Sequence, residues 1–173
     1  SARSPRRLWT RAETPPAFTV TSKVSLQAKQ LRILKNRDTF AVLDASGDIL
    51  VGSASAEGLY HRDTRHLSYF AIGLNGVRPL LLSSRMRDDN SAVTCDYTNP
   101  EMRENGQVTL EQDLIHVSRA QFLWQGVLYQ RVAVRNYSED HLSSITLDFA
   151  FTADFVDLFE VRGVARAQHG RIH

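Results

Sequence analysis

The chain has 173 residues, 42% of them hydrophobic and 23% charged, with a formal net charge of +2. These values suit one globular domain with a core and argue against general disorder. The 21 basic residues are scattered among 19 acidic ones, so the sequence lacks the concentrated positive stripe of a nucleic-acid-binding protein, and no run is long and apolar enough to predict a membrane span.

The single cysteine, Cys95, cannot form an internal disulfide, and no group of cysteines and histidines has the spacing of a zinc finger. We therefore expect a reducing, cytoplasmic location and no metal or other cofactor.

The N-terminal residues 1–17 differ from the rest in composition. Four arginines surround Leu8 and Trp9, and the stretch closes with Pro15-Pro16. A positive, proline-bounded terminus predicts a mobile tail, and a docking arm that uses Trp9 is the alternative. The expected domain then covers residues 18–173.

From Phe18 the sequence predicts short strands separated by turns. Residues 25–34 are ambiguous between a helical turn and a strand, and Arg32–Leu34 favours the strand. The turn residues 45–47 predict a hairpin between residues 40–43 and 48–51.

A second hairpin is predicted at Asn75-Gly76, a dipeptide suited to positive φ at both turn positions. Residues 70–74 precede it and residues 77–82 follow it. Pro79 has no amide hydrogen, which places it at a sheet edge or a bulge. Further strands are expected at residues 93–97 and 108–114.

The clearest alternation covers residues 144–152, in which Ile145, Leu147, Phe149 and Phe151 occupy every second position. This period predicts a strand with a buried apolar face, so Phe149 and Phe151 are expected in the core. The preceding strand, residues 127–135, is expected to pair with it as a hairpin. About ten such strands predict an all-β fold, an antiparallel β-sandwich of one domain.

The segment from residue 154 to residue 163 ends the strand pattern. It carries Asp154, Asp157 and Glu160 at intervals of three, which would place them on one side of a helical turn. A catalytic carboxylate pair is one interpretation. Capping and ion pairing beside Arg162 is the interpretation we prefer. The chain also has the character of a piece cut from a longer protein, so we expect the domain to continue beyond it.

The most polar segment lies between apolar stretches, and segments of this kind often carry function in β-rich domains. It contains His61, Arg62, Asp63, Arg65 and His66. The ligand types suit zinc, but the spacing matches no standard site. We expect Asp63 to accept hydrogen bonds from Arg62, Arg65 or nearby backbone donors and so fix the loop. The loop is then purely structural, or it is a structural lock that also presents Arg65 and His66 to a sugar or another domain.

Trp124 and Tyr129 raise the possibility of sugar binding, since sugars stack on exposed aromatic rings. Trp124 lies in an apolar run, which is more typical of a core or an interface. Gln125-Gly126 could form a bulge that turns Trp124 outward. We name Arg62, Asp63, Arg65, His66 and Trp124 as candidate substrate or domain-interface residues, and no catalytic residue.

Three ordered blocks carry a resemblance to a known family. They are residues 58–68 (GLYHRDTRHLS), 122–137 (FLWQGVLYQRVAVRNY) and 153–163 (ADFVDLFEVRG). Residues 34–170 resemble the N-terminal domain of glycogen-debranching-enzyme-like proteins, the amylo-α-1,6-glucosidases. The resemblance implies a supersandwich-like fold and a downstream helical toroid that holds the glycosidase carboxylates, which have no counterpart in this sequence.

The resemblance implies a non-catalytic domain that braces the toroid and contributes to the wall of its α-glucan cleft. Its expected partners are its own catalytic domain and, as a second candidate, α-glucan, with no nucleic acid and no membrane. The chain alone is expected to be inactive, whereas the full-length protein is expected to be a glycoside hydrolase. The alternatives are an autonomous carbohydrate-binding module, which needs an exposed aromatic platform, and a protein-interaction sandwich, which needs a large apolar patch.

Overall fold

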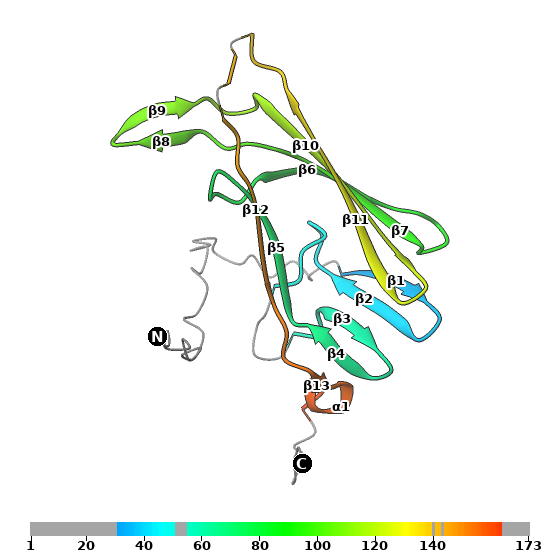
Figure 1. The fold of residues 1–173 in the computed structure, drawn as a ribbon. Helices are drawn as coiled ribbons and strands as arrows, with labels where there is room; N and C mark the ends of the chain where they lie inside the picture. Colours follow the sequence, from blue (N-terminus) through cyan, green and yellow to red (C-terminus); the bar gives the residue numbers. More distant parts are fainter. Residues whose placement is uncertain (1–30, 51–54, 140, 143, 164–173) are drawn as a thin grey trace, which may run out of the picture.

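The computed structural model describes residues 31–50, 55–139, 141–142 and 144–163 (Figure 1). The predicted tail at residues 1–17 and the start of the predicted domain lie outside the described residues. Within the described part, the chain forms strands β1 to β13 and one short helix, α1. The predicted all-β, sandwich-like domain is confirmed. No helix in this part of the chain has the length and hydropathy needed to span a membrane.

Two larger sheets contain most of the strands, and every strand pair is antiparallel. The five-stranded sheet comprises, in spatial order, β1 (Arg32–Asn36), β2 (Thr39–Leu43), β3 (Gly58–His61), β4 (Thr64–Leu67) and β13 (Val156–Asp157). The four-stranded sheet comprises β11 (Val127–Asn136), β10 (Ile115–Trp124), β7 (Ala92–Thr98) and β6 (Leu80–Met86).

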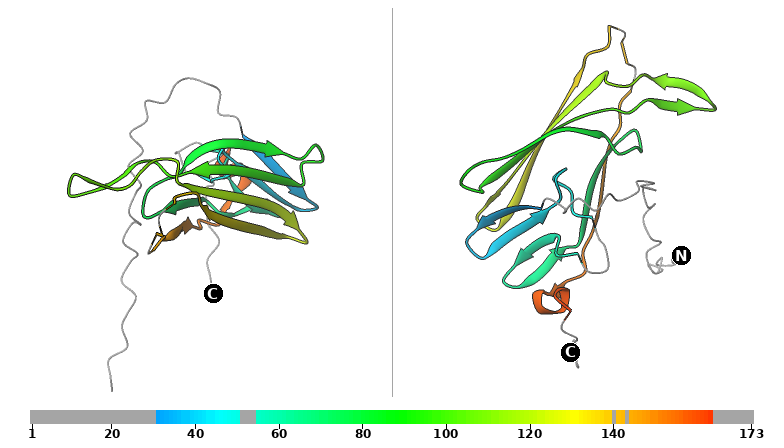
Figure 2. Two further views of the ribbon diagram at one scale, coloured as in Figure 1. Left: turned by 90° about the horizontal axis from the view of Figure 1, so that it is seen from above. Right: turned by 180° about the vertical axis from the view of Figure 1, so that it is seen from behind.

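Two strand pairs complete the fold. One is the ribbon of β5 (Tyr69–Leu74) and β12 (Leu147–Thr152), and the other is the pair β8 (Met102–Glu104) and β9 (Gln107–Leu110). The ribbon runs along one side of the molecule to α1 (Leu158–Val161), whereas β8 and β9 project as an arm (Figures 1 and 2).

The core lies where the inner face of the four-stranded sheet meets β1, β2 and the ribbon. Alternate residues of β7 and β10 point into it. Its buried hydrophobic side chains include Leu34, Leu43, Ile49, Ile72, Leu74, Val93, Tyr97, Ile115 and Val117. Period-two alternation therefore positions this core, as the sequence indicates.

The predicted pairing of residues 127–135 with residues 144–152 is wrong. β11 instead pairs with β10, with Trp124 opposite Val127 and Ile115 opposite Asn136. Gln125 and Gly126 have φ of 49° and 80°, so they form a tight two-residue turn rather than the expected bulge. The connection after β11 then carries the chain to the ribbon, where β12 pairs with β5.

Two other predicted hairpins are reduced to turns. Asn75 and Gly76 adopt positive φ as expected, but only one bridge, Leu74 with Val77, follows before Pro79. β6 then pairs with β7. At residues 44–48 the Asp44 and Asp48 backbones hydrogen-bond across the turn, yet Ile49 bridges to Phe70 of β5. Of the predicted return strand, Val51 lies outside the described residues.

The expectation that Phe149 and Phe151 are core residues is also wrong, since their side chains are 47% and 66% exposed. The period-two alternation of β12 itself is present. Phe149 and Phe151 share one face of the strand, where they lie opposite Ile72 and Phe70 of β5. Ile72, on β5, is buried in the core, whereas β12 is paired on one side only, with β5. No strand among the described residues covers its apolar face.

Candidate functional site

The polar segment singled out in the sequence forms the hairpin of β3 and β4. Arg62 and Asp63 are its two turn residues, with φ of 46° and 64°, and both are exposed. Positive φ at both positions is typical of the tight turns that fit the twist of paired strands. The backbone of Asp63 also accepts a hydrogen bond from the amide of Leu158 at 2.7 Å, which ties the turn to α1.

Arg65, on β4, is bound by Asp154 rather than by Asp63, so Arg65 is wrong as one of the three donors expected for Asp63. Its Nε lies 3.2 and 3.1 Å from the two carboxylate oxygens of Asp154, and its Nη2 contacts Oδ2 as well. Its Nη1 donates to the carbonyls of Ser55 and Glu57. These hydrogen bonds to Asp154 raise the pKa of the guanidinium, so Arg65 is a fixed cation.

The three carboxylates after β12 are also engaged in local structure. Asp154 binds Arg65. Asp157 is the N-cap of α1 and accepts a hydrogen bond from the amide of Phe159 at 2.8 Å, while Glu160 bonds back to the amide of Asp157 at 3.3 Å. This reciprocal capping box fixes the entry into α1. The preferred interpretation, capping and ion pairing, fits these contacts, although the cation is Arg65 and not Arg162.

The two histidines lie beside the turn. His61 Nδ1 is 2.8 Å from the hydroxyl of Thr39, and the rings of His61 and His66 are 6.2 Å apart. His66 is exposed and meets the ring of Phe155 edge to face at 5.6 Å. Nowhere in the described ranges do three histidine, cysteine, aspartate or glutamate side chains gather as metal ligands would.

We call this part of the molecule the hairpin end, defined by Arg62, Asp63, His66, Phe155 and Phe159. β13 pairs with β4 and so places the start of α1 next to the β3–β4 turn. Phe155 and Phe159 are 65% and 59% exposed there. The hairpin end therefore combines a fixed backbone with exposed aromatic and charged side chains. Trp124 is not part of it, because that residue lies on the four-stranded sheet.

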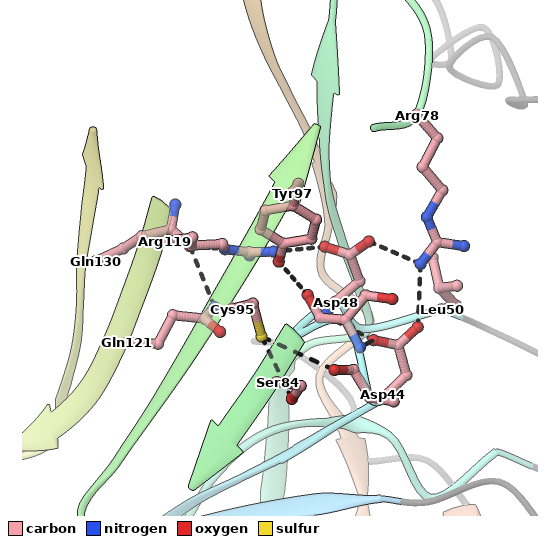
Figure 3. A network of polar contacts seen from close by, with 12 residues as sticks. Asp44, Asp48, Leu50, Arg78, Ser84, Cys95, Tyr97, Arg119, Gln121 and Gln130 are labelled. Carbon is pink, nitrogen blue, oxygen red and sulfur yellow. Dashed lines mark hydrogen bonds and ion pairs between the residues drawn. The ribbon is translucent and has the colours of Figure 1, made fainter. Parts of the chain in front are cut away.

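A second polar cluster lies inside the molecule and was not found by sequence reasoning (Figure 3). Arg119, on β10, is fully buried, and its Nη1 lies 2.5 Å from Oδ1 of Asp48. Arg78 binds the other oxygen of Asp48 at 3.0 Å and also Asp44 at 3.1 Å. Gln130 accepts from Nε of Arg119 at 2.6 Å. Two carboxylates and two guanidiniums thus balance in charge.

The electrostatics of this cluster follow from its burial. Desolvation raises the pKa of Asp48, and the charges of Arg119 and Arg78 oppose that shift. Burial likewise raises the pKa of Tyr97, whose hydroxyl donates to the carbonyl of Ser46. The guanidinium of Arg119 also lies over the ring of Phe70, 5.0 Å from its centre. The ion pairs of the cluster join the turn after β2 to the four-stranded sheet.

A sequence signal for this cluster does exist. Arg119 and Gln121 occupy the same alternating positions as the buried Val117 and Leu123. A polar residue in phase with a buried face must find partners inside the fold.

Residues 34–173 match the family described as the N-terminal domain of some glycogen debranching enzymes. No curated protein and no solved structure matches the chain significantly. The family match spans the hairpin end, the buried polar cluster and nearly every described strand. The chain therefore belongs to the family of N-terminal domains found in some glycogen debranching enzymes.

Proposed function

We propose that this domain braces the catalytic toroid of a glycogen-debranching-like glycoside hydrolase and forms part of the wall of its α-glucan cleft. The domain itself is non-catalytic in this proposal. In support, Asp154 is bound to Arg65, and Asp157 and Glu160 cap α1. Carboxylates held in this way are not poised as an acid and base pair facing a substrate.

The observation that carries the proposal is the composition of the hairpin end. Phe155 and Phe159 are more than half exposed beside His66 and the charged turn residues Arg62 and Asp63. Exposed aromatic side chains with charged neighbours are typical of a protein interface. Its backbone is fixed by β13 pairing and by the capping box, so little order would be lost on docking.

The proposal is tested in the full-length enzyme with branched and linear α-glucans. Asp63→Asn and Phe159→Ala should each lower kcat/KM about tenfold, since an interface side chain contributes about 1–2 kcal/mol. The melting temperature of the isolated chain should stay unchanged, because both side chains are exposed. Leu82→Ala, on β6, is the matched control because Leu82 is 59% exposed, as Phe159 is.

Unchanged activity of both hairpin-end variants on every accepted glucan would refute the cleft-wall role. Steady release of glucose by the purified 173-residue chain, abolished by Asp157→Asn, would refute the non-catalytic role. We also propose a cytoplasmic location, which the single free and buried Cys95 supports, since a reducing compartment needs no disulfides.

A further inference from the structure

The outward face of β10 and β11 is a second exposed surface, separate from the hairpin end. Residues that lie opposite each other in an antiparallel pair share one face of the sheet. The register therefore gathers these side chains on the face that points away from the core: His116, Ser118, Ala120, Phe122, Trp124, Val127, Tyr129, Arg131, Ala133 and Arg135. We call this set the outer face.

One end of the outer face is aromatic and uncovered. Trp124 is 56% exposed and lies opposite Val127. In the next cross-strand pair, the rings of Phe122 and Tyr129 are 5.0 Å apart and nearly parallel, at 10°. On β7 the neighbour of Phe122 is Ala92, whose small side chain leaves that flank open. Three exposed aromatic rings at one point of a sheet mark a binding surface.

The middle of the outer face carries mainly small side chains. Ala120 pairs with Arg131, and Ser118 pairs with Ala133, so small side chains occupy most of these positions. Thr94 and Asp96 of β7 continue the same rows. Arg131 is exposed here and offers hydrogen-bond donors to a ligand lying over the small residues.

The far end of the outer face is polar and internally braced. His116 Nε2 lies 3.3 Å from the carboxylate of Asp96, which also accepts a hydrogen bond from Ser83 at 3.0 Å. Arg135 lies over the ring of Tyr137 at 5.8 Å, and His116 meets the same ring edge to face. Tyr137 is 59% exposed. Donors, acceptors and one more aromatic ring thus stand together.

The order of these groups indicates the shape of the ligand. Aromatic rings stand at both ends, about 26 Å apart along the strand from Tyr129 to Tyr137. Between them lie small and polar side chains. A protein interface has the opposite order, an apolar centre within a polar rim. An elongated ligand with apolar ring faces and hydroxyl edges fits this pattern, whereas the carboxylate of Asp96 and the low net charge of the chain disfavour a polyanion.

We propose that the outer face binds an α-glucan chain. Trp124, Phe122 and Tyr129 stack on sugar rings at one end, and Asp96, His116 and the two arginines bond to hydroxyl groups farther along. The choice of α-glucan among polysaccharides rests on the proposed function. The surface is distinct from the cleft wall at the hairpin end, so it would hold a second stretch of the polymer.

The test uses the purified 173-residue chain, maltose and maltoheptaose in calorimetry, and glycogen in affinity electrophoresis. Maltoheptaose should bind more tightly than maltose, because only the longer ligand reaches the polar groups at the far end of the outer face. Trp124→Ala and Tyr129→Ala should each weaken binding about tenfold, as expected for the loss of one ring contact. Trp124→Phe should retain most of the affinity. Phe151→Ala, an exposed aromatic change on β12, should leave it unchanged.

Several results would overturn the inference. They are the absence of binding to maltoheptaose and glycogen, equal affinity for maltose and maltoheptaose, or full binding by the Trp124→Ala/Tyr129→Ala double variant. Salt-dependent binding of a single-stranded oligonucleotide in place of glucan would assign the face to nucleic acid. Failure here would leave the activity test of the hairpin end intact. Conversely, glucan binding that persists while the hairpin-end variants stay fully active would refute only the cleft wall.

Discussion

Arg119 connects several elements of the interior. It is fully buried on β10, and it reaches Asp48 on the turn after β2, Gln130 on β11 and the ring of Phe70 on β5. Elements distant in sequence therefore meet at one guanidinium. Desolvating a charge is costly, so this arrangement is stable only because Asp48, Arg78 and Asp44 complete the charge balance.

Replacing Arg119 by methionine should destabilise the domain by about 3–5 kcal/mol, because Asp48 would remain buried with only Arg78 as its partner. Urea unfolding followed by circular dichroism measures this loss. Arg131→Ala, on the exposed face of the neighbouring strand, is the matched control and should change stability by less than about 0.5 kcal/mol. A loss below about 1 kcal/mol for Arg119→Met would show that the ion pair is not buried as described.

At the scale of elements, a glycine of the β3–β4 hairpin leaves room for the side chain of an ion-paired arginine. The side chain of Arg65 crosses directly over Gly58 on its way to Asp154. A Cβ at position 58 would lie 2.6 Å from Cδ and 2.9 Å from Cγ of Arg65. The glycine therefore provides the space through which the arginine passes.

Gly58→Ala should cost about 1–3 kcal/mol, because the arginine must leave its position or the strands must separate. The two closest contacts disappear when Arg65 is shortened, and only Cε2 of Tyr60 at 3.0 Å remains, so Gly58→Ala should cost clearly less in an Arg65→Ala background. A double-mutant cycle on unfolding free energies measures this coupling. Gly106→Ala, in the β8–β9 turn where a Cβ meets nothing, measures the cost of an alanine at positive φ without a steric clash. Additive effects of Gly58→Ala and Arg65→Ala would contradict the packing described.

At the scale of the whole molecule, the sequence predicts elements better than it predicts their partners. Alternation and turn residues identify the all-β class and strands such as β7, β11 and β12. Pairing is a property of the assembled fold. The alternation in residues 144–152 is compatible with any neighbouring strand, and only the structure shows that β12 joins β5. Family resemblance, by contrast, was readable from three local blocks.

For the candidate site too, the sequence predicts the local structure but not the contacts between distant residues. The segment around Arg62 and Asp63 could be recognised as unusual, and its turn follows from local residues. The partner of Arg65 could not be predicted from the sequence, because Asp154 lies 89 positions away. A carboxylate two positions from an arginine was the obvious partner, yet the strand directions place Asp63 in the turn.

The molecule is open on the side of β12, so two residues that share one face of the ribbon should differ in their contribution to stability. Phe149 and Ile72 lie opposite each other on one face of the ribbon, but Phe149 is 47% exposed whereas Ile72 is 1% exposed. Ile72→Ala should therefore cost about 2–5 kcal/mol, as in a closed core. Phe149→Ala should cost only about 1 kcal/mol, since it loses mainly its contact with Phe70 at 6.4 Å. Equal losses in urea unfolding of the 173-residue chain would mean that this side of the sandwich is covered in solution.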